Sequence, residues 1–366
     1  MKNIKKLPFI LSILSLLNIF APANADVKVV TSIKPIHSLA SYLMDGVGKP
    51  DLIVDGYASP HGFALKPSHA KMLQDADLIF WVGEDLESFL EKPLKSIAKK
   101  AEKIELMEIN GLNKLKFRER NIFDDHDDHG HGEDDHDDDH DGHAKKKKDG
   151  HDDHDGHDED GHKEDGHDDH DGHDEDGHKE DGHDNHDGHD DHGHEGHAHG
   201  EYDPHIWLDP INAKVILKEM TEHLVENDSK NASVYKKNLE NALRDLDKLT
   251  MNVMTELNQS TASIVFHDAY QYFEERFNVN ILGAFTVNTD VMPGAEQLAE
   301  IREIIEHDNV TCAFSEPQFN PDIIKAVAKD MNIKTGVVDP LGATLNPGKD
   351  LYFDLIKNMS TSFKGC

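Results

Sequence analysis

The residues from Asp124 to Glu201 most constrain how this chain can fold, because they are largely His, Asp, Glu and Gly. A sixteen-residue unit, DGHDDHDGHDEDGHKE, runs from Asp149 to Glu164 and repeats unchanged from Asp165 to Glu180. A segment with so little apolar surface cannot offset the conformational entropy that folding costs. We therefore expect a disordered insert at 124–201, and we expect the rest of the chain to build the fold.

The insert has a composition suited to binding metal ions. It holds 21 of the 28 histidines in the chain, and imidazole and carboxylate groups are ligands for borderline divalent metals. Solvation alone would account for the Asp and Glu residues but not for a His every few positions. We interpret the insert as an auxiliary, weak metal-capture loop that includes His126, His129, His131, His151, His154, His157, His189, His192, His194, His197 and His199.

The charge of the chain is concentrated in this insert. Of the formal net charge of −35, the residues 124–201 contribute −28 and all other residues only −7. Because the folded part has an ordinary charge for a soluble protein and no basic excess, we expect no nucleic-acid partner.

The N-terminus has the pattern of a secretory signal peptide at residues 1–25. Lys2, Lys5 and Lys6 precede a short apolar run, and Ala23-Asn24-Ala25 fits a small-residue cleavage site. The apolar run is too short to span a membrane comfortably, and no later stretch is more apolar, so no membrane insertion is expected. The sequence predicts a mature chain that begins at Asp26 and is free in a bacterial periplasm.

The two cysteines, Cys312 and Cys366, lie far apart in the sequence. An even count in an exported protein favours a disulfide, which would contribute about 4 kcal/mol on the chain-entropy model. Two inert thiols and a zinc-binding pair are the alternatives, although two cysteines so far apart make a poor metal motif.

Strand and helix patterns alternate through the rest of the chain, which predicts an α/β fold with parallel sheets and ligands at the carboxyl ends of strands. We expect strands at Val27–Ile33, Leu52–Val54, Asp77–Val82, Ile104–Ile109, Ser263–Phe266, Val279–Phe285, Thr311–Phe314 and Thr335–Val338. We expect one helix that begins at Pro35, a second that is capped by Ser68 and a last one that begins at Lys349. Further helices are expected at Asn212–Asn227, Ala269–Phe277, Gly294–His307 and Pro321–Met331.

One expected helix is unusually long. It would be capped by Asp228 or Ser229 and run to about Asn258, a length of some 45 Å at 1.5 Å per residue. We interpret it as a rigid strut at 228–259 between an N-terminal α/β lobe at 26–227 and a C-terminal α/β lobe at 260–366.

Seven histidines lie outside the insert, and their positions separate them into two groups. Four are expected in helices, where a solvent-facing side chain is the simplest interpretation, although the first of them could pack in a cleft: His37, His69, His223 and His307. The other three follow predicted strands or lie in stiff loops: His61 in a Gly/Pro-rich loop, His205 in YDPHIWLDP and His267 at the end of SIVF.

These three loop histidines are our candidate metal ligands. Asp339, which ends the strand TGVV, is a fourth candidate, and a water molecule is the alternative. Three neutral imidazoles with one carboxylate or water suit Zn²⁺, whereas Mn²⁺ would favour more oxygen ligands.

The chain resembles the metal-binding receptors of ABC importers, specifically their zinc-uptake branch. The resemblance covers the whole mature chain and rests on the segments TSIKPIHSL, ASPHGFALKPSHAKMLQDADLIFWVG, DPHIWLDP, VFHDAYQYF, CAFSEPQF and VVDPLG, and on the position of the His/Asp-rich insert. It implies two lobes of parallel sheet and helices, joined by one long rigid helix, with the metal in the cleft between them.

The resemblance also implies roles for particular residues. His61, His205 and His267 match the three histidine ligands, and Asp339 matches a position whose role as a ligand varies in zinc receptors. Pro60 stands where some zinc receptors have a Glu that can complete the coordination, so the fourth ligand stays open between Asp339 and water. Cys312 and Cys366 match a disulfide found in part of the branch.

The function implied is capture of Zn²⁺ in the periplasm and delivery to an inner-membrane ABC permease with a cytoplasmic ATPase, by a monomer that is not an enzyme. Manganese-type receptors carry Glu where His267 stands, which favours zinc. A receptor for manganese or another divalent metal, and a periplasmic zinc buffer without a transporter, are the alternatives. A zinc hydrolase is disfavoured because the sequence contains no HExxH motif.

Overall fold

The computed structural model describes residues 27–118, 120–123, 200–257, 261–289 and 291–366. The expected signal peptide and the eleven insert histidines named above lie outside these residues. Gly200 and Glu201, which were assigned to the insert, belong instead to the described fold. The backbone N–H of Gly200 donates to Asp85 Oδ1, and the carbonyl of Glu201 accepts from Phe117 N, so both are held by hydrogen bonds.

Two four-stranded sheets organise the fold, and every neighbouring pair within them is parallel. The first sheet has the order β2-β1-β3-β4, built from β1 Val29–Ile33, β2 Asp51–Val54, β3 Leu78–Trp81 and β4 Glu102–Glu105. The second has the order β6-β5-β7-β8, built from β5 Ser263–His267, β6 Ile281–Thr286, β7 Cys312–Ser315 and β8 Lys334–Val337. The predicted α/β fold with two parallel sheets is confirmed.

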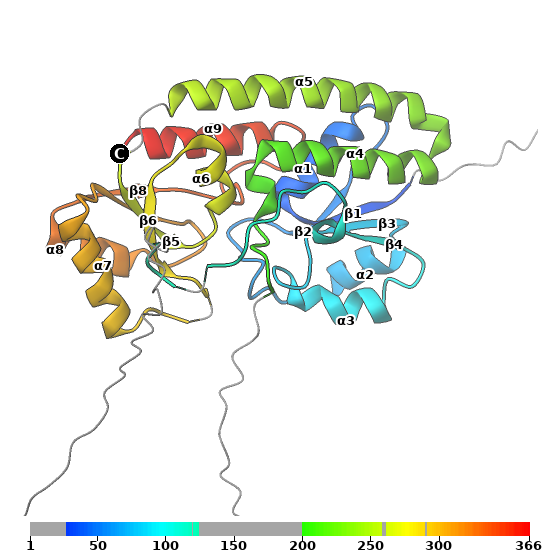
Figure 1. Ribbon diagram of the computed structural model, residues 1–366. Helices are drawn as coiled ribbons and strands as arrows, with labels where there is room; N and C mark the ends of the chain where they lie inside the picture. Colours follow the sequence, from blue (N-terminus) through cyan, green and yellow to red (C-terminus); the bar gives the residue numbers. More distant parts are fainter. Residues whose placement is uncertain (1–26, 119, 124–199, 258–260, 290) are drawn as a thin grey trace, which may run out of the picture. The chain divides into compact units, whose positions relative to one another are not determined.

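Helices connect and cover these strands (Figure 1). They are α1 Lys34–Leu43, α2 Pro67–Asp75, α3 Ser88–Ser96, α4 Pro210–Asn227, α5 Ala232–Glu256, α6 Gln271–Phe277, α7 Ala295–His307, α8 Asp322–Met331 and α9 Leu351–Lys364. Short 3₁₀ turns occur at η1 Leu106–Glu108, η2 Ile206–Leu208 and η3 Ser229–Asn231.

Two local predictions were wrong. The strand expected at Ile104–Ile109 is β4, which ends at Glu105 because its partner β3 ends at Trp81, and the chain then turns into η1. Ser68 does not cap α2, because the helix begins one residue earlier at Pro67, where the fixed φ of proline suits the first helical position. The sequence reasoning also did not predict α3.

The long helix α5 has 25 residues and spans about 38 Å, shorter than expected because the chain from Ser229 to Asn231 forms the separate turn η3. It packs against α1, α4 and α9. The last helix, α9, lies alongside α5 and also contacts α1 of the first sheet (Figure 1). The C-terminal helix therefore ties the second sheet to the first in addition to α5.

The main hydrophobic core is continuous between the two sheets. It contains Phe80 from the first sheet, Phe314 from the second, and the fully buried rings of Trp207, Tyr235 and Tyr352. A smaller core, which includes Ile264, Phe285, Ile301 and Ile324, packs α7 and α8 against the second sheet. Because a shared apolar core resists separation, we expect these two sheets to move little against one another.

Cys312, which begins β7, forms a disulfide with Cys366 at the end of the chain. This confirms the predicted bond and fastens the end of α9 to the second sheet. Within the described ranges, none of the helices has both the length and the apolar character needed to cross a bilayer.

Candidate metal centre

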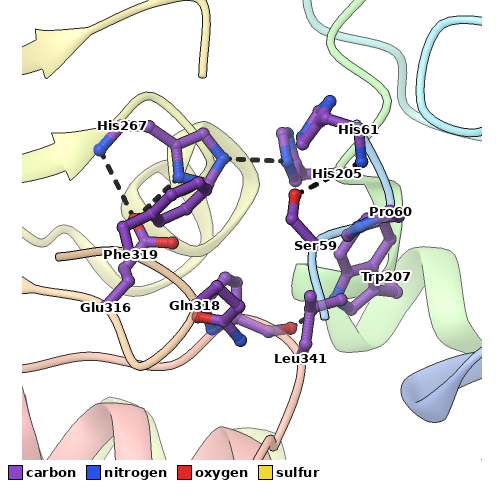
Figure 2. Close-up of a pocket in the computed structure, with 11 residues that line it drawn as sticks. Ser59, Pro60, His61, His205, Trp207, His267, Glu316, Gln318, Phe319 and Leu341 are labelled. Atoms are coloured by element: carbon purple, nitrogen blue, oxygen red, sulfur yellow. Dashed lines mark hydrogen bonds and ion pairs between the residues drawn. The ribbon is translucent and has the colours of Figure 1, made fainter. Parts of the chain in front are cut away.

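His61, His205 and His267 come from three distant segments, and the structure brings their rings together (Figure 2). One ligand atom from each lies within 4.8 Å of the other two, and the ring centroids are 5.2 to 5.7 Å apart. The Nε2 atoms of His205 and His267 are 3.3 Å apart. Three imidazole nitrogens therefore face one small volume.

The backbone positions of these residues follow from the parallel sheets. His267 is the last residue of β5, and His61 lies in the loop that follows the carboxyl end of β2. His205 immediately precedes η2, in a segment that Asp203 and Pro204 hold in a tight turn, with Asp203 Oδ1 accepting from His205 N at 2.9 Å. Loops at the carboxyl ends of parallel strands are where ligands bind in α/β folds.

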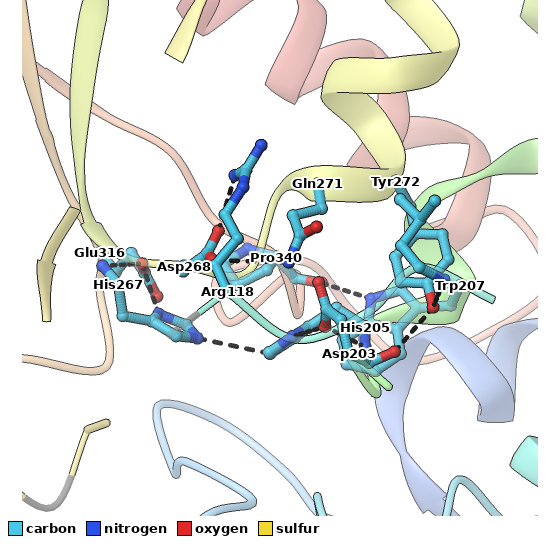
Figure 3. Close-up of polar contacts among 11 residues, drawn as sticks. Arg118, Asp203, His205, Trp207, His267, Asp268, Gln271, Tyr272, Glu316 and Pro340 are labelled. Atoms are coloured by element: carbon cyan, nitrogen blue, oxygen red, sulfur yellow. Dashed lines mark hydrogen bonds and ion pairs between the residues drawn. The ribbon is translucent and has the colours of Figure 1, made fainter. Parts of the chain in front are cut away.

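Two buried carboxylates fix the orientation of two of the rings (Figure 3). Asp203 Oδ1 lies 2.7 Å from Nδ1 of His205, and Glu316 Oε1 lies 2.7 Å from Nδ1 of His267. A carboxylate on Nδ1 keeps the proton there and leaves the lone pair of Nε2 available for a metal. The Nε2 atoms of His205 and His267, which face one another, are therefore the nitrogens with a lone pair available to a metal ion.

The sequence reasoning missed both carboxylates. Asp203 stands two residues before a candidate ligand, and Glu316 directly follows the end of β7, beside the strand that carries His267. A search for acidic residues at strand ends next to candidate histidines would have found Glu316.

Burial changes the ionisation of these groups. Burial of His205 lowers the pKa of its imidazole well below the usual value, so the ring is neutral and able to bind a cation. For His267 burial is the largest influence and acts to lower the pKa, but the carboxylate of Glu316 and other nearby acids outweigh it and the net pKa is raised. Burial also raises the pKa of Asp203 to about 7.

The remaining wall of the pocket is mostly apolar. Besides the three histidines and Glu316, it is lined by Ser59, Pro60, Trp207, Gln318, Phe319, Pro340 and Leu341. Trp207 is fixed because its Nε1 donates to the carbonyl of Pro340 at 2.8 Å. Such a lining lowers the local dielectric constant and so strengthens the interaction between an ion and its ligands.

Asp339, one of the two candidates for the fourth ligand, is not among the residues whose ligand atoms cluster with the three histidines. Its Oδ1 accepts hydrogen bonds from Gln318 Nε2 and from the backbone N–H groups of Leu341 and Gly342, and its Oδ2 accepts from Ala343 N. These four bonds shape the loop after β8, and they engage both carboxylate oxygens of this candidate ligand.

The four helical histidines differ from one another in exposure. His307 is exposed, as expected, and His223 is half-buried. His69 was expected to be exposed, but it is buried because its ring stacks on Phe63 and its Nδ1 accepts from the backbone N–H of Lys66. His37 is buried as well, with Nε2 3.1 Å from the carbonyl oxygen of Pro50.

The sequence of this chain matches a protein family described as the periplasmic component A of zinc-uptake complexes, over residues 29–366. Among curated proteins, the high-affinity zinc uptake system protein ZnuA of Brucella abortus is 44% identical over 340 residues, which cover 92% of this chain and 91% of that protein. The protein of the same name from Yersinia pestis is 34% identical and covers 97% of this chain and 95% of its own length.

Solved structures share the fold at lower sequence identity. A crystal structure of ZnuA has a TM-score of 0.62 at 17% identity, with 92% of this chain and 99% of that chain covered. A zinc-bound ZnuA deletion mutant gives a TM-score of 0.63 at 18% identity, covering 93% and 98%. The laminin-binding protein of Streptococcus agalactiae, described as an adhesin with metal-transporting activity, gives 0.62 at 18% identity, covering 92% and 99%.

Proposed function

This chain belongs to the family of periplasmic zinc-uptake components, and we propose that His61, His205 and His267 hold the Zn²⁺ that it binds. As a member, it is a periplasmic zinc-binding receptor of a zinc ABC importer. The family is one of transport proteins, so the ion is cargo that is bound and released without bond chemistry. What remains to be assigned is the coordination.

The convergence of three imidazoles in one buried pocket is the observation that carries this assignment. Zn²⁺ prefers four tetrahedral ligands and accepts neutral imidazole nitrogen, with protein-to-metal distances of about 2 Å. Closing the three rings around an ion would satisfy three positions. Because the carboxylate of Asp339 is already engaged by four donors, we assign the fourth position to a water molecule.

Replacement of the histidines by alanine tests the assignment. The triple variant His61→Ala, His205→Ala, His267→Ala should lose the tight site when Zn²⁺ binding is measured in competition with a chelator of known affinity. The matched control is His307→Ala, because that side chain is exposed on α7 and should leave the tight site intact. Tight binding that persisted in the triple variant would contradict the assignment.

We further propose that the His/Asp-rich insert collects Zn²⁺ weakly at several sites. Its ends join the fold at Phe123, whose N–H donates to Leu282 O, and at Gly200, which is bonded to Asp85. Deleting residues 124–199 with a short Gly/Ser linker would keep both of these anchors. Calorimetric titration of that variant should retain one tight site and lose the additional weak ones, and an unchanged stoichiometry would exclude this role for the insert.

Delivery of the ion requires further partners, and we propose an inner-membrane permease with a cytoplasmic ATPase. We also propose that the receptor acts as a monomer and that the signal peptide at 1–25 directs its export. N-terminal sequencing of the exported protein should begin at Asp26. A strain that lacks the receptor should grow poorly in chelated medium and recover when Zn²⁺ is added. A zinc buffer without a transporter would not produce this requirement for added Zn²⁺.

A further inference from the structure

A second group of metal-ligating side chains lies on α4, away from the three histidines. His223 and Glu226 are three residues apart and so share one face of the helix, and Glu102 reaches them from the start of β4. One ligand atom from each of the three lies within 4.8 Å of the other two. His223 lies about 20 Å along α4 from the end that adjoins His205, so this cluster is separate from the first site.

The ring of His223 has the arrangement expected of a metal ligand. Its Nε2 lies 3.3 Å from Oε1 of Glu219, one helical turn earlier. Its Nδ1 is buried and faces Oε1 of Glu102 at 2.7 Å, so the ring nitrogen and the carboxylate oxygen point at the same small volume. Proteins orient metal-binding imidazoles with a carboxylate on one ring nitrogen while the other nitrogen binds the metal. Here Glu219 lies at Nε2, and Nδ1 is the nitrogen that shares its space with Glu102.

The charge around His223 also favours a cation. Glu102, Glu219 and Glu226 surround the ring, and within the part of the chain that the structure describes no Lys or Arg forms an ion pair with any of them. Glu102 is held in place because Asn227 Nδ2 donates to its Oε2 at 2.9 Å. Three carboxylates with one imidazole leave a net negative charge that a divalent ion would neutralise.

We propose that Glu102, His223 and Glu226 form a second divalent-cation site with Glu219 as a positioning residue. One imidazole nitrogen and two carboxylate oxygens suit Zn²⁺ or a similar borderline ion better than Mg²⁺, which takes oxygen ligands and keeps its own water. The side chains of His223 and Glu102 are 20% and 42% exposed, so water completes the coordination and binding is weaker than at the buried centre.

Carbethoxylation of His223 in the full chain tests this site, with the modified residue identified by peptide mass spectrometry. The reagent attacks an unprotonated ring nitrogen, so Zn²⁺ on Nδ1 removes the reactive lone pair. At a Zn²⁺ concentration about ten times the Kd, modification of His223 should slow about tenfold. The protection should persist in the His205→Ala, His267→Ala variant, which separates this site from the first.

Two controls make the result specific. The variant Glu102→Gln, Glu226→Gln should lose the protection by Zn²⁺ while His223 stays reactive, and Mg²⁺ should protect neither protein. Modification of the exposed His307 should not change when Zn²⁺ is added. If Zn²⁺ leaves the rate at His223 unchanged, or if the protection survives the double Gln substitution, the cluster is an ordinary ion pair of histidine with glutamate and the proposal is overturned.

Discussion

Lys34 and Ala343 are in direct contact although 309 positions separate them in the sequence, with Lys34 Nζ donating to the carbonyl of Ala343 at 3.0 Å. The same ammonium group donates to the carbonyls of Gly342 and Leu345, and Asp55 Oδ1 lies 3.3 Å away. Lys34 begins α1, whereas the three carbonyls belong to the loop that follows Pro340 at the metal pocket. One buried charge thus fixes a loop of the site to the first sheet.

We expect Lys34→Met to destabilise the protein by about 3 kcal/mol, because it leaves buried carbonyl groups without a donor. Urea unfolding of the zinc-free protein measures this. The matched control is Lys349→Met, which removes a solvent-exposed ion pair with Asp45 and should cost less than about 1 kcal/mol. If both variants lost the same unfolding free energy, the buried hydrogen bonds of Lys34 would contribute no more than the exposed ion pair of Lys349.

The two carboxylates that contact Nδ1 of His205 and His267 should control zinc affinity. Glu316→Gln and Asp203→Asn keep the shape of each side chain but weaken the hold on Nδ1 of His267 and His205. We expect each to reduce Zn²⁺ affinity about 10- to 100-fold in chelator competition. Glu303→Gln, on the exposed face of α7, is the control and should not change affinity. Unchanged affinity in all three variants would argue against a role in positioning.

The disulfide should stabilise the fold without affecting the metal. Cys312 and Cys366 are 54 positions apart, so replacing both by alanine should lower the free energy of unfolding by about 4 kcal/mol. Neither residue lines the metal pocket, and Zn²⁺ affinity should be unchanged. Urea unfolding measures the first effect and chelator competition the second, with chemically reduced wild-type protein as an independent comparison. A loss of zinc affinity would show that α9 positions the site.

Glu87 should make stability depend on pH. It is fully buried, and its Oε2 accepts from the N–H groups of Val82 and Gly83. Burial raises its pKa to about 7 from the usual 4.5, so the protonated form is favoured by folding. The resulting stability is complete below about pH 4.5 and is lost as pH rises through about 7, a difference of up to ~3 kcal/mol.

Glu87→Gln mimics the protonated acid and retains an oxygen acceptor for both N–H groups. The variant should therefore become more stable relative to wild type as the pH rises from 5 to 8. Urea unfolding at these two pH values measures the change. Glu303→Gln again provides the exposed control, with no such dependence. If the difference in unfolding free energy between wild type and Glu87→Gln were the same at pH 5 and pH 8, a raised pKa of Glu87 would be refuted.

Much of the fold could be predicted because strands that are buried on both faces have a distinctive sequence. β1 and β3 are runs of buried, mainly apolar residues that form the centre of the first sheet, and such runs between helical segments indicate a parallel sheet. The bounds of β4 could not be predicted, because they depend on where its neighbour β3 ends. The cap of α2 was missed because Pro67 begins the helix one residue before Ser68.

The candidate ligands could be chosen from the sequence because His61, His205 and His267 stand in loops near strand ends. Asp339 stands at such a place too, and it was a candidate for the fourth ligand with water as the alternative. The difference between them is tertiary: the N–H groups of Leu341, Gly342 and Ala343 converge on Asp339 and occupy its carboxylate. A linear pattern places a side chain near a site but does not reveal which partners it has there.

The sequence by itself determined the class of fold, the family and the His- and Asp-rich composition of the insert, and it singled out three candidate histidines, because these depend on residue type and local order. Only the tertiary structure decided which groups surround them. Asp203 and Glu316 orient the rings, Lys34 fixes the loop beside the pocket, and Glu102 meets His223 across more than a hundred positions. Such contacts arise when packed strands and helices bring distant segments within a few ångströms, and no local pattern encodes that distance.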